Sequence, residues 1–341
     1  MRKILISLII LSSISLFAQE EKRLALVIGN ANYEKGELKN PVNDARLIAS
    51  TLDSLDFDVI LKENLESQTD FKIAILEFGK KRPEYDIAFV YYAGHGVQIS
   101  GENYLLPTKV EFSSEDEVEM FGVSVQDIMR YLKSQTNEVN ILILDACRDN
   151  PFESNWNKTR SLKGGGLAKI PPPTGSLIAF STDSGQTAPD GDGENSIYST
   201  SLAKNMLLED TSIDQVFRNV RAEVLAETKG AQRPVEATQL TGQTFYLAMG
   251  DFTKFLPKID KLINEKKNFE ALDLATSLIE KDLNNSIWYK KRAEIYSSLN
   301  QFDKMLDDYL NCLTLNPNSS EYYFLIAKSY YELYHKEKKE W

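Results

Sequence analysis

Hydrophobic runs of strand length alternate with amphipathic stretches through the first two-thirds of the chain. Several runs are uninterrupted and rich in Val and Ile, which is typical of strands covered on both faces of a parallel sheet. The expected strands are residues 24–28, 58–61, 87–92, 140–144, 176–180 and 244–247. The spacing of apolar residues predicts helices over residues 41–55, 70–82, 124–133, 196–208 and 213–228. This order predicts an α/β domain over residues 22–250, doubly wound around a mostly parallel six-stranded sheet with flanking helices.

A different pattern begins near Phe252, where helical stretches rich in Tyr, Leu, Ala and Lys replace the strands. Ala293 and Tyr296 recur 34 residues later as Ala327 and Tyr330. A repeat of this length, with small residues where two helices touch, resembles tetratricopeptide repeats. We therefore expect a small all-α, tetratricopeptide-like region over residues 255–341, which offers a surface for a protein partner. The alternative is an irregular helical tail whose aromatic residues form its own core.

Residues 1–18 have the composition of a secretory signal. Arg2 and Lys3 precede an apolar run that ends at Phe17, and Ala18 is a small residue suited to a cleavage site. The run is shorter than the ~20 residues that span a bilayer, so we expect no stable membrane span. The predicted localisation is export, either to the periplasm or out of the cell.

Composition narrows the possible partners and cofactors. The net charge of −11 argues against nucleic acid, because nucleic-acid-binding proteins present a basic face. The chain has two cysteines, Cys147 and Cys312, and two distant histidines, which form neither a disulfide framework nor a zinc cluster. No metal site and no cofactor are predicted, and a need for calcium stays open. A structural protein linked by a Cys147–Cys312 disulfide is one alternative.

His95 and Cys147 follow two of the predicted strands directly. Polar residues at the carboxyl ends of neighbouring parallel strands meet at one edge of the sheet, where ligands bind in open α/β folds. A thiolate is a nucleophile, and an adjacent imidazole can take its proton and later protonate a leaving amine. The backbone N–H groups of Gly96 and Cys147 could form an oxyanion hole. The alternative for each residue is a structural role, as a buried thiol or a satisfied histidine.

The segments around both residues resemble a known family. Tyr-Tyr-Ala-Gly-His95-Gly and Leu-Asp145-Ala-Cys147-Arg are similar to the two signatures of caspase-like peptidases, including metacaspases and paracaspases. The separation of 52 residues is close to the spacing of about 50 in caspases. Further motifs fit bacterial members, and the resemblance extends over residues 23–249. It implies a caspase-like fold and a cysteine endopeptidase with His95 and Cys147 as its catalytic dyad.

The resemblance also implies a substrate preference. Asp145 stands where caspases carry Gln, and relatives that cut after Arg or Lys have an acidic residue there and another at the position of Asp44. Two carboxylates in one pocket favour a guanidinium or an ammonium group. Asp183 or Asp190, in a loop rich in Gly, Asp and Ser, could add a third carboxylate. For Asp44 a role in its own helix is the alternative.

These observations predict an exported cysteine endopeptidase that hydrolyses proteins or peptides after Arg or Lys. The alternative function is a catalytically silent scaffold that binds proteins through its caspase-like domain and helical repeats. The presence of both dyad residues favours the enzyme.

Overall fold

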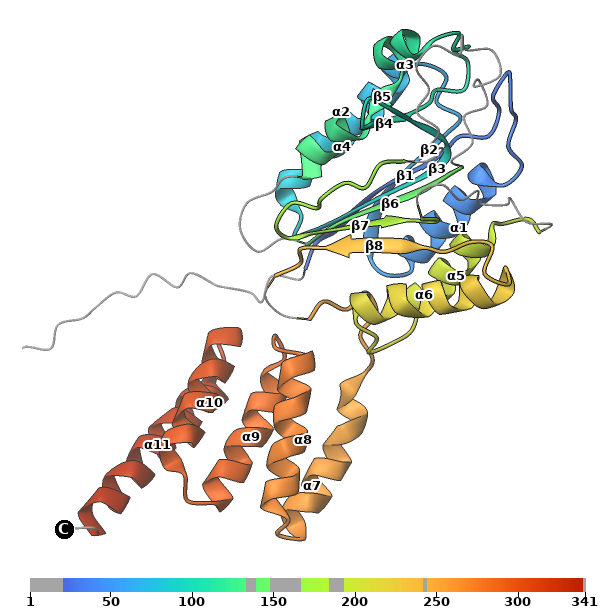
Figure 1. The fold of residues 1–341 in the computed structure, drawn as a ribbon. Coiled ribbons are helices and arrows are strands. Elements are labelled where there is room, and N and C mark those ends of the chain that lie inside the picture. Colours follow the sequence, from blue (N-terminus) through green and yellow to red (C-terminus); the bar gives the residue numbers. More distant parts are fainter. Residues whose placement is uncertain (1–20, 133–138, 148–166, 184–192, 242–243, 340–341) are drawn as a thin grey trace, which may run out of the picture. The chain divides into compact units, whose positions relative to one another are not determined.

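The computed structural model describes residues 21–132, 139–147, 167–183, 193–241 and 244–339 (Figure 1). The predicted signal at residues 1–18 therefore lies outside the described residues. The chain divides into two compact units, Glu21–Met249 and a second that includes Gly250–Trp341. The first unit is built around a sheet, and the second consists of helices.

The sheet of the first unit has a main path of six strands in the order β2-β1-β3-β6-β7-β8 (Figure 1). They are β1 (Arg23–Gly29), β2 (Phe57–Glu63), β3 (Ile87–Ile99), β6 (Val139–Cys147), β7 (Ser176–Phe180) and β8 (Val235–Thr238). The strands pair in parallel, except that β8 is antiparallel to β7. Two short strands, β4 (Glu102–Leu105) and β5 (Val123–Ser124), continue the sheet from the end of β3 to give eight strands among the described residues. The predicted doubly wound, mostly parallel sheet is confirmed.

Helices cover both faces of this sheet, which explains why its strands read as uninterrupted apolar runs (Figure 1). One face is covered by α1 (Pro41–Asp53), α5 (Ile197–Met206) and α6 (Ile213–Glu227), and the other by α2 (Gln68–Lys81) and α4 (Val125–Leu132). Alternate residues of one strand enter different cores: Tyr91 packs on the α1 side and Val90 on the α2 side. Both cores are closed to solvent. Polar side chains can therefore gather at the carboxyl ends of the strands.

Three parts of the predicted sheet differ from the structure. Residues 244–247 do not form the sixth strand; Tyr246 makes one isolated bridge with Ser212, and the sixth strand is β8. β8 is an edge strand with mostly exposed side chains, so it lacks the hydrophobic run that marks the others. β3 also continues beyond residue 92 to Ile99, because its end pairs with β4. The helix α3 (Glu115–Phe121) lies between β4 and β5 and was not expected from the apolar pattern.

The second unit is all-helical, as predicted. After the short 3-10 helix η3 (Phe252–Phe255) it comprises α7 (Leu256–Asn264), α8 (Asn268–Lys281), α9 (Ser286–Ser298), α10 (Phe302–Leu315) and α11 (Ser320–Lys339). Each helix packs against the next one in the chain. Trp288 and Ala293 of α9 are fully buried. Cys312 is a buried free thiol that donates a hydrogen bond to the carbonyl of Ser286 at 3.3 Å, so a disulfide with Cys147 has no support.

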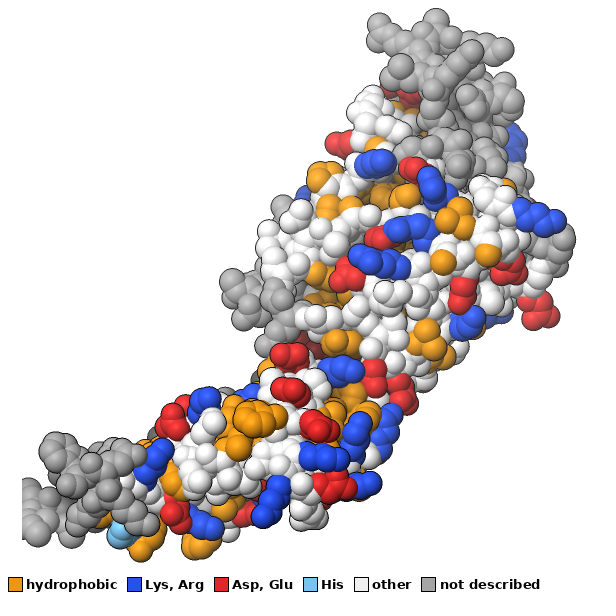
Figure 2. All heavy atoms as spheres, turned by 60° about the horizontal axis from the view of Figure 1, so that its bottom comes forward, with side chains coloured by type: hydrophobic (Ala, Val, Ile, Leu, Met, Phe, Trp, Pro, Cys, Tyr) orange, Lys and Arg blue, Asp and Glu red, His pale blue; other side chains and the backbone are white. Residues whose placement is uncertain are grey.

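The surface of the helical unit is charged in both signs. Figure 2 shows Lys and Arg side chains interspersed with Asp and Glu side chains over its visible face. Several of these charges form ion pairs, such as Lys290 with Glu321 at 2.6 Å and Lys291 with Asp260 at 2.8 Å. Among the helices that the structure describes in either unit, none is long and apolar enough to cross a membrane.

Candidate active site

His95 and Cys147 lie directly opposite each other in the sheet. The parallel pairing of β3 with β6 runs from Ile87 and Val139 to a last register pair, His95 and Cys147. Neighbouring strands lie about 4.8 Å apart, so the two backbones are adjacent at this point. The structure describes the backbone of Cys147, and residues 148–166 after it lie outside the described part. The two residues identified from sequence are therefore neighbours in space as well as in motif.

The imidazole of His95 is held by the loop between β1 and α1. Its side chain is buried, with 5% of the residue exposed. Nε2 lies 2.6 Å from the backbone carbonyl oxygen of Gly36, and because a carbonyl only accepts, Nε2 carries the hydrogen. In the neutral ring this leaves Nδ1 as the acceptor. The Tyr33 ring also packs against the imidazole, with centroids 4.4 Å apart.

The backbone of His95 is fixed by two tyrosines. Its N–H donates to the Tyr33 hydroxyl at 2.9 Å, and its carbonyl accepts from the Tyr92 hydroxyl at 2.7 Å. Gly94, just before it, has a φ of 152°, and a Cβ there would lie 2.6 Å from the Tyr33 hydroxyl. A larger residue at Gly94 would therefore displace the tyrosine that positions His95.

Asp44 is a buried carboxylate in the first turn of α1, with 2% of the residue exposed. Its Oδ1 accepts hydrogen bonds from the side-chain amide of Asn195 at 3.0 Å and from the backbone N–H of Ser196 at 2.9 Å. Both donors lie at the start of α5, far from Asp44 in sequence. The carboxylate therefore faces another element of the domain rather than capping its own helix.

Asp145 lies two residues before Cys147 on β6 and is partly buried. Its Oδ2 accepts from the hydroxyls of Ser199 at 2.8 Å, Ser196 at 3.1 Å and Tyr91 at 3.2 Å. Ser196 bridges the two acids, because its N–H binds Asp44 and its hydroxyl binds Asp145. The structure therefore brings Asp44 and Asp145 together in one polar cluster beside the end of β6.

Burial disfavours the charged form of both acids. Desolvation, with a further contribution from the nearby Asp145 charge, raises the pKa of Asp44 to about 7. Burial also raises the pKa of Asp145, against the hydrogen bonds from the serine and tyrosine hydroxyls. Within the described part of the chain, no Lys or Arg forms an ion pair with either carboxylate. Two buried carboxyl groups without a basic partner among the described residues have the chemistry that favours a cation.

Of the remaining predicted site residues, Gly96 is described by the structure and Asp190 is not. Gly96 lies within β3, opposite Leu105 of β4, and a Cβ there would come within 3.1 Å of the Ala146 side chain. Asp190 lies outside the described residues. The described residues contain no group of three His, Cys, Asp or Glu side chains that could hold a metal ion.

Sequence reasoning missed several residues of the candidate site, both around His95 and in the acidic cluster. Gly36 contributes a backbone carbonyl, which no residue type signals, and Tyr33 and Tyr91 look like ordinary core aromatics. Ser196 did carry a signal, because a serine before a helical stretch is a common N-cap, whereas Ser199 lies inside the helix and carried none. Ser196 indeed caps α5 by accepting from the N–H of Ser199 at 3.1 Å. Their contact with Asp145 could only come from the fold.

Comparison with known proteins supports the same reading of the fold. The Caspase domain family matches residues 22–245, well over half of the chain. Caspase-1 from Spodoptera frugiperda has a similar fold, with a TM-score of 0.51 and 15% sequence identity, over 68% of this chain and 92% of that one.

Two curated relatives match parts of the chain at the sequence level. The mucosa-associated lymphoid tissue lymphoma translocation protein 1 of Homo sapiens is 30% identical over 129 residues, 37% of this chain but 15% of that protein. A small glutamine-rich tetratricopeptide repeat-containing protein of Dictyostelium discoideum is 38% identical over 61 residues, 18% of each chain. The chain thus spans less than a fifth of the length of these relatives. With the family match over residues 22–245, the chain belongs to the caspase-domain family of cysteine peptidases.

Proposed function

We propose that the protein is a cysteine endopeptidase that uses His95 and Cys147 as a dyad and cleaves after Arg or Lys. The observation that carries the proposal is the register pair His95–Cys147, with Asp145 two residues earlier on the same strand. Nucleophile, base and cation-binding carboxylate then lie on two adjacent strands of one rigid sheet. Such placement favours precise positioning of a substrate.

The proposed reaction has two steps. The Cys147 thiolate attacks the carbonyl carbon before the scissile bond, forming a C–S bond, and the C–N bond then breaks. The imidazolium of His95 gives its proton to the leaving nitrogen, and the neutral ring then takes a proton from the water that hydrolyses the thioester. The Gly36 carbonyl, 2.6 Å from Nε2, supports this role because it orients the ring and stabilises its positive charge.

The N–H groups of Gly96 and Cys147 are the proposed oxyanion donors. They belong to adjacent strands next to the register pair of the dyad. Gly96 has no side chain, and a Cβ there would meet Ala146 on β6, so the glycine lets the two strands lie close together beside the dyad.

The acidic cluster supports the preference for basic residues. A guanidinium can bind carboxylates through paired hydrogen bonds, and here it would supply the cation that Asp44 and Asp145 lack within the described chain. A substrate aspartate would instead be a buried charge among like charges. The proposed enzyme therefore cleaves after Arg or Lys and rejects Asp.

A panel of fluorogenic peptides that differ only in the residue before the scissile bond tests the preference. We expect wild type to hydrolyse the Arg and Lys peptides and to leave the Asp peptide intact. Asp145→Asn keeps the size of the side chain and removes its charge, so kcat/KM for the Arg peptide should fall by more than about tenfold.

The matched control is Asp53→Asn, which changes an exposed aspartate at the end of α1. It should leave the Arg preference intact. Equal hydrolysis of Asp and Arg peptides by wild type would contradict the assignment of Asp44 and Asp145 to the substrate pocket.

For the helical unit we propose a tetratricopeptide-like module that binds a protein partner. The recurrence of Ala293 and Tyr296 after 34 residues and the local match to a tetratricopeptide repeat-containing protein support this proposal.

A further inference from the structure

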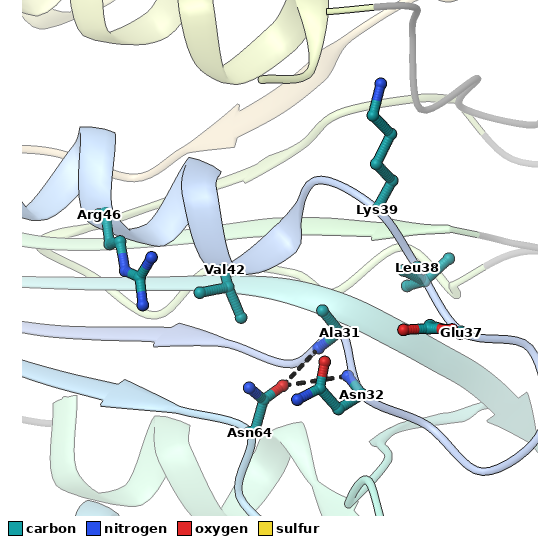
Figure 3. A pocket seen from close by; sticks show the side chains of 8 residues that line it. All are labelled: Ala31, Asn32, Glu37, Leu38, Lys39, Val42, Arg46 and Asn64. Atoms are coloured by element: carbon teal, nitrogen blue, oxygen red, sulfur yellow. Dashed lines mark hydrogen bonds between the residues drawn. The ribbon is translucent and has the colours of Figure 1, made fainter. Parts of the chain in front are cut away.

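A cavity of about 580 Å³ lies at the carboxyl ends of β1 and β2, outside the acidic cluster (Figure 3). Its apolar wall consists of Ala31 and Leu38 from the loop after β1 and Val42 from the first turn of α1. Asn64, just after β2, and Asn32 form its polar rim together with the charged residues Glu37, Lys39 and Arg46. The proposed reaction as described above makes no use of this cavity.

The loop between β1 and α1 separates the cavity from His95. Tyr33 and Gly36 of this loop contact the His95 imidazole, whereas Ala31 and Leu38 of the same loop line the cavity. The loop is closed on itself by a hydrogen bond from the Leu38 N–H to the Ala31 carbonyl at 3.0 Å. The cavity and the candidate catalytic histidine thus share one wall.

This wall is also tied to β2. The side-chain oxygen of Asn64 accepts from the N–H groups of Ala31 at 2.9 Å and Asn32 at 3.0 Å, as Figure 3 shows. Asn64 itself has a positive φ of 50°, a conformation that asparagine tolerates better than most residues. Hydrogen bonds between the ends of β1 and β2 therefore fix the shape of the cavity wall.

The order of the strands gives the direction in which a substrate would run. Cys147 is on β6, His95 is on β3, and β1 and β2 follow on the far side of β3 from β6. His95 protonates the leaving nitrogen in the proposed reaction, so the leaving part of the substrate lies on the His95 side. Neighbouring strands lie about 4.8 Å apart, so the midpoint between β1 and β2 is roughly 7 Å from β3. An extended peptide covers this distance with about two residues.

We propose that this cavity is a subsite for the leaving side of the substrate and accepts an aliphatic side chain at the second or third residue after the scissile bond. The inference rests on the proposed peptidase function and adds a second specificity element to it. The apolar wall suits an aliphatic group. Arg46 in the rim is paired with Glu63 at 2.7 Å, and the other charged lining residues are one acid, Glu37, and one base, Lys39. The charges at the rim therefore balance and give no net attraction for a substrate acid.

Two sets of peptides test the inference. The first is a short Arg peptide with a fluorescent amine directly after the scissile bond, which reports the proposed function without the cavity. The second is a series of internally quenched Arg peptides that carry Leu, Phe, Gly or Asp at the second and third positions after that bond. We expect wild type to favour Leu over Gly by about fivefold to tenfold in kcat/KM, because burial of an aliphatic side chain favours binding.

Three variants locate this preference. Val42→Trp fills the cavity and should reduce the Leu-over-Gly ratio to about one, while Val42→Ala enlarges it and should shift the preference toward Phe. Ser50→Trp, an exposed position on the same helix outside the cavity, should keep the wild-type ratio. A wild-type ratio near one, or a ratio unchanged in both Val42 variants, overturns the inference. Loss of activity toward the short peptide in wild type would instead overturn the proposed function.

Discussion

At the scale of single residues, the acidic cluster is the most informative feature of the site. Asp44 and Asp145 are held by Asn195, Ser196 and Ser199, which are neutral donors. Neutral donors stabilise a buried carboxylate less than a cation does, so its pKa stays raised. A bound guanidinium or ammonium group would therefore stabilise the charged form of the cluster most. Protonation of the two carboxylates should in turn control how well such a cation binds.

This protonation predicts a pH dependence that is specific to basic substrates. Asp44 has a pKa of about 7, so it gains a proton as the pH falls through 7 and loses its attraction for a cation. We expect the ratio of kcat/KM for an Arg peptide to that for a Gln peptide to fall as the pH is lowered from 8 to 6. The ratio cancels the pH dependence of the catalytic steps that both peptides share.

Asp44→Asn provides the control for that profile. The variant should have a lower Arg preference at pH 8 and a ratio that changes less between pH 8 and 6. A wild-type ratio that is constant across this range would contradict the role given to Asp44.

At the scale of elements, hydrophobic patterning predicted the strands that are buried on both faces and the edge strand β2, and it failed at the other edge, β8. β1, β3, β6 and β7 were recognised because each carries an unbroken apolar run. The sixth strand was predicted at residues 244–247 and not at β8. The side chains of β8 are mostly exposed, so its sequence has no apolar run, and it becomes a strand only by pairing with β7. The hydrogen bonds of Ser199 and Gly36 likewise depend on elements distant in sequence, so residue type did not reveal them.

In the helical unit, one ion pair joins α9 to α10. Arg292 donates two hydrogen bonds of 2.8 Å to the carboxylate of Asp308, whose side chain is 3% exposed. Asp308→Ala would leave the guanidinium without its partner, and we expect α9 and α10 to lose about 3 kcal/mol of stability. Denaturant-dependent hydrogen exchange of peptides from both helices measures this loss.

Asp307→Ala is the matched control, because Asp307 is the exposed neighbour on the same helix. It should change stability by less than about 0.5 kcal/mol. Equal effects of the two substitutions would show that the ion pair contributes nothing particular to the packing of α9 on α10.

At the scale of the whole molecule, a caspase domain is combined with an all-helical unit in one chain. Both parts were recognisable from sequence, the first by its strand pattern and the motifs around His95 and Cys147, the second by its change in composition. Ala293 is fully buried in α9, whereas Ala327, one repeat later in α11, is exposed. The repeat pattern therefore predicts the helices better than it predicts what each helix contacts.

The most direct test of the account compares its two cysteines. The measurement is kcat/KM for an Arg peptide in wild type, Cys147→Ala and Cys312→Ala. Removal of the nucleophile should lower the rate by at least about a thousandfold. Cys312 is buried in the helical unit, where burial raises the pKa of its thiol to about 12, so its replacement should leave the rate near wild type. Near-normal turnover by Cys147→Ala would contradict the account.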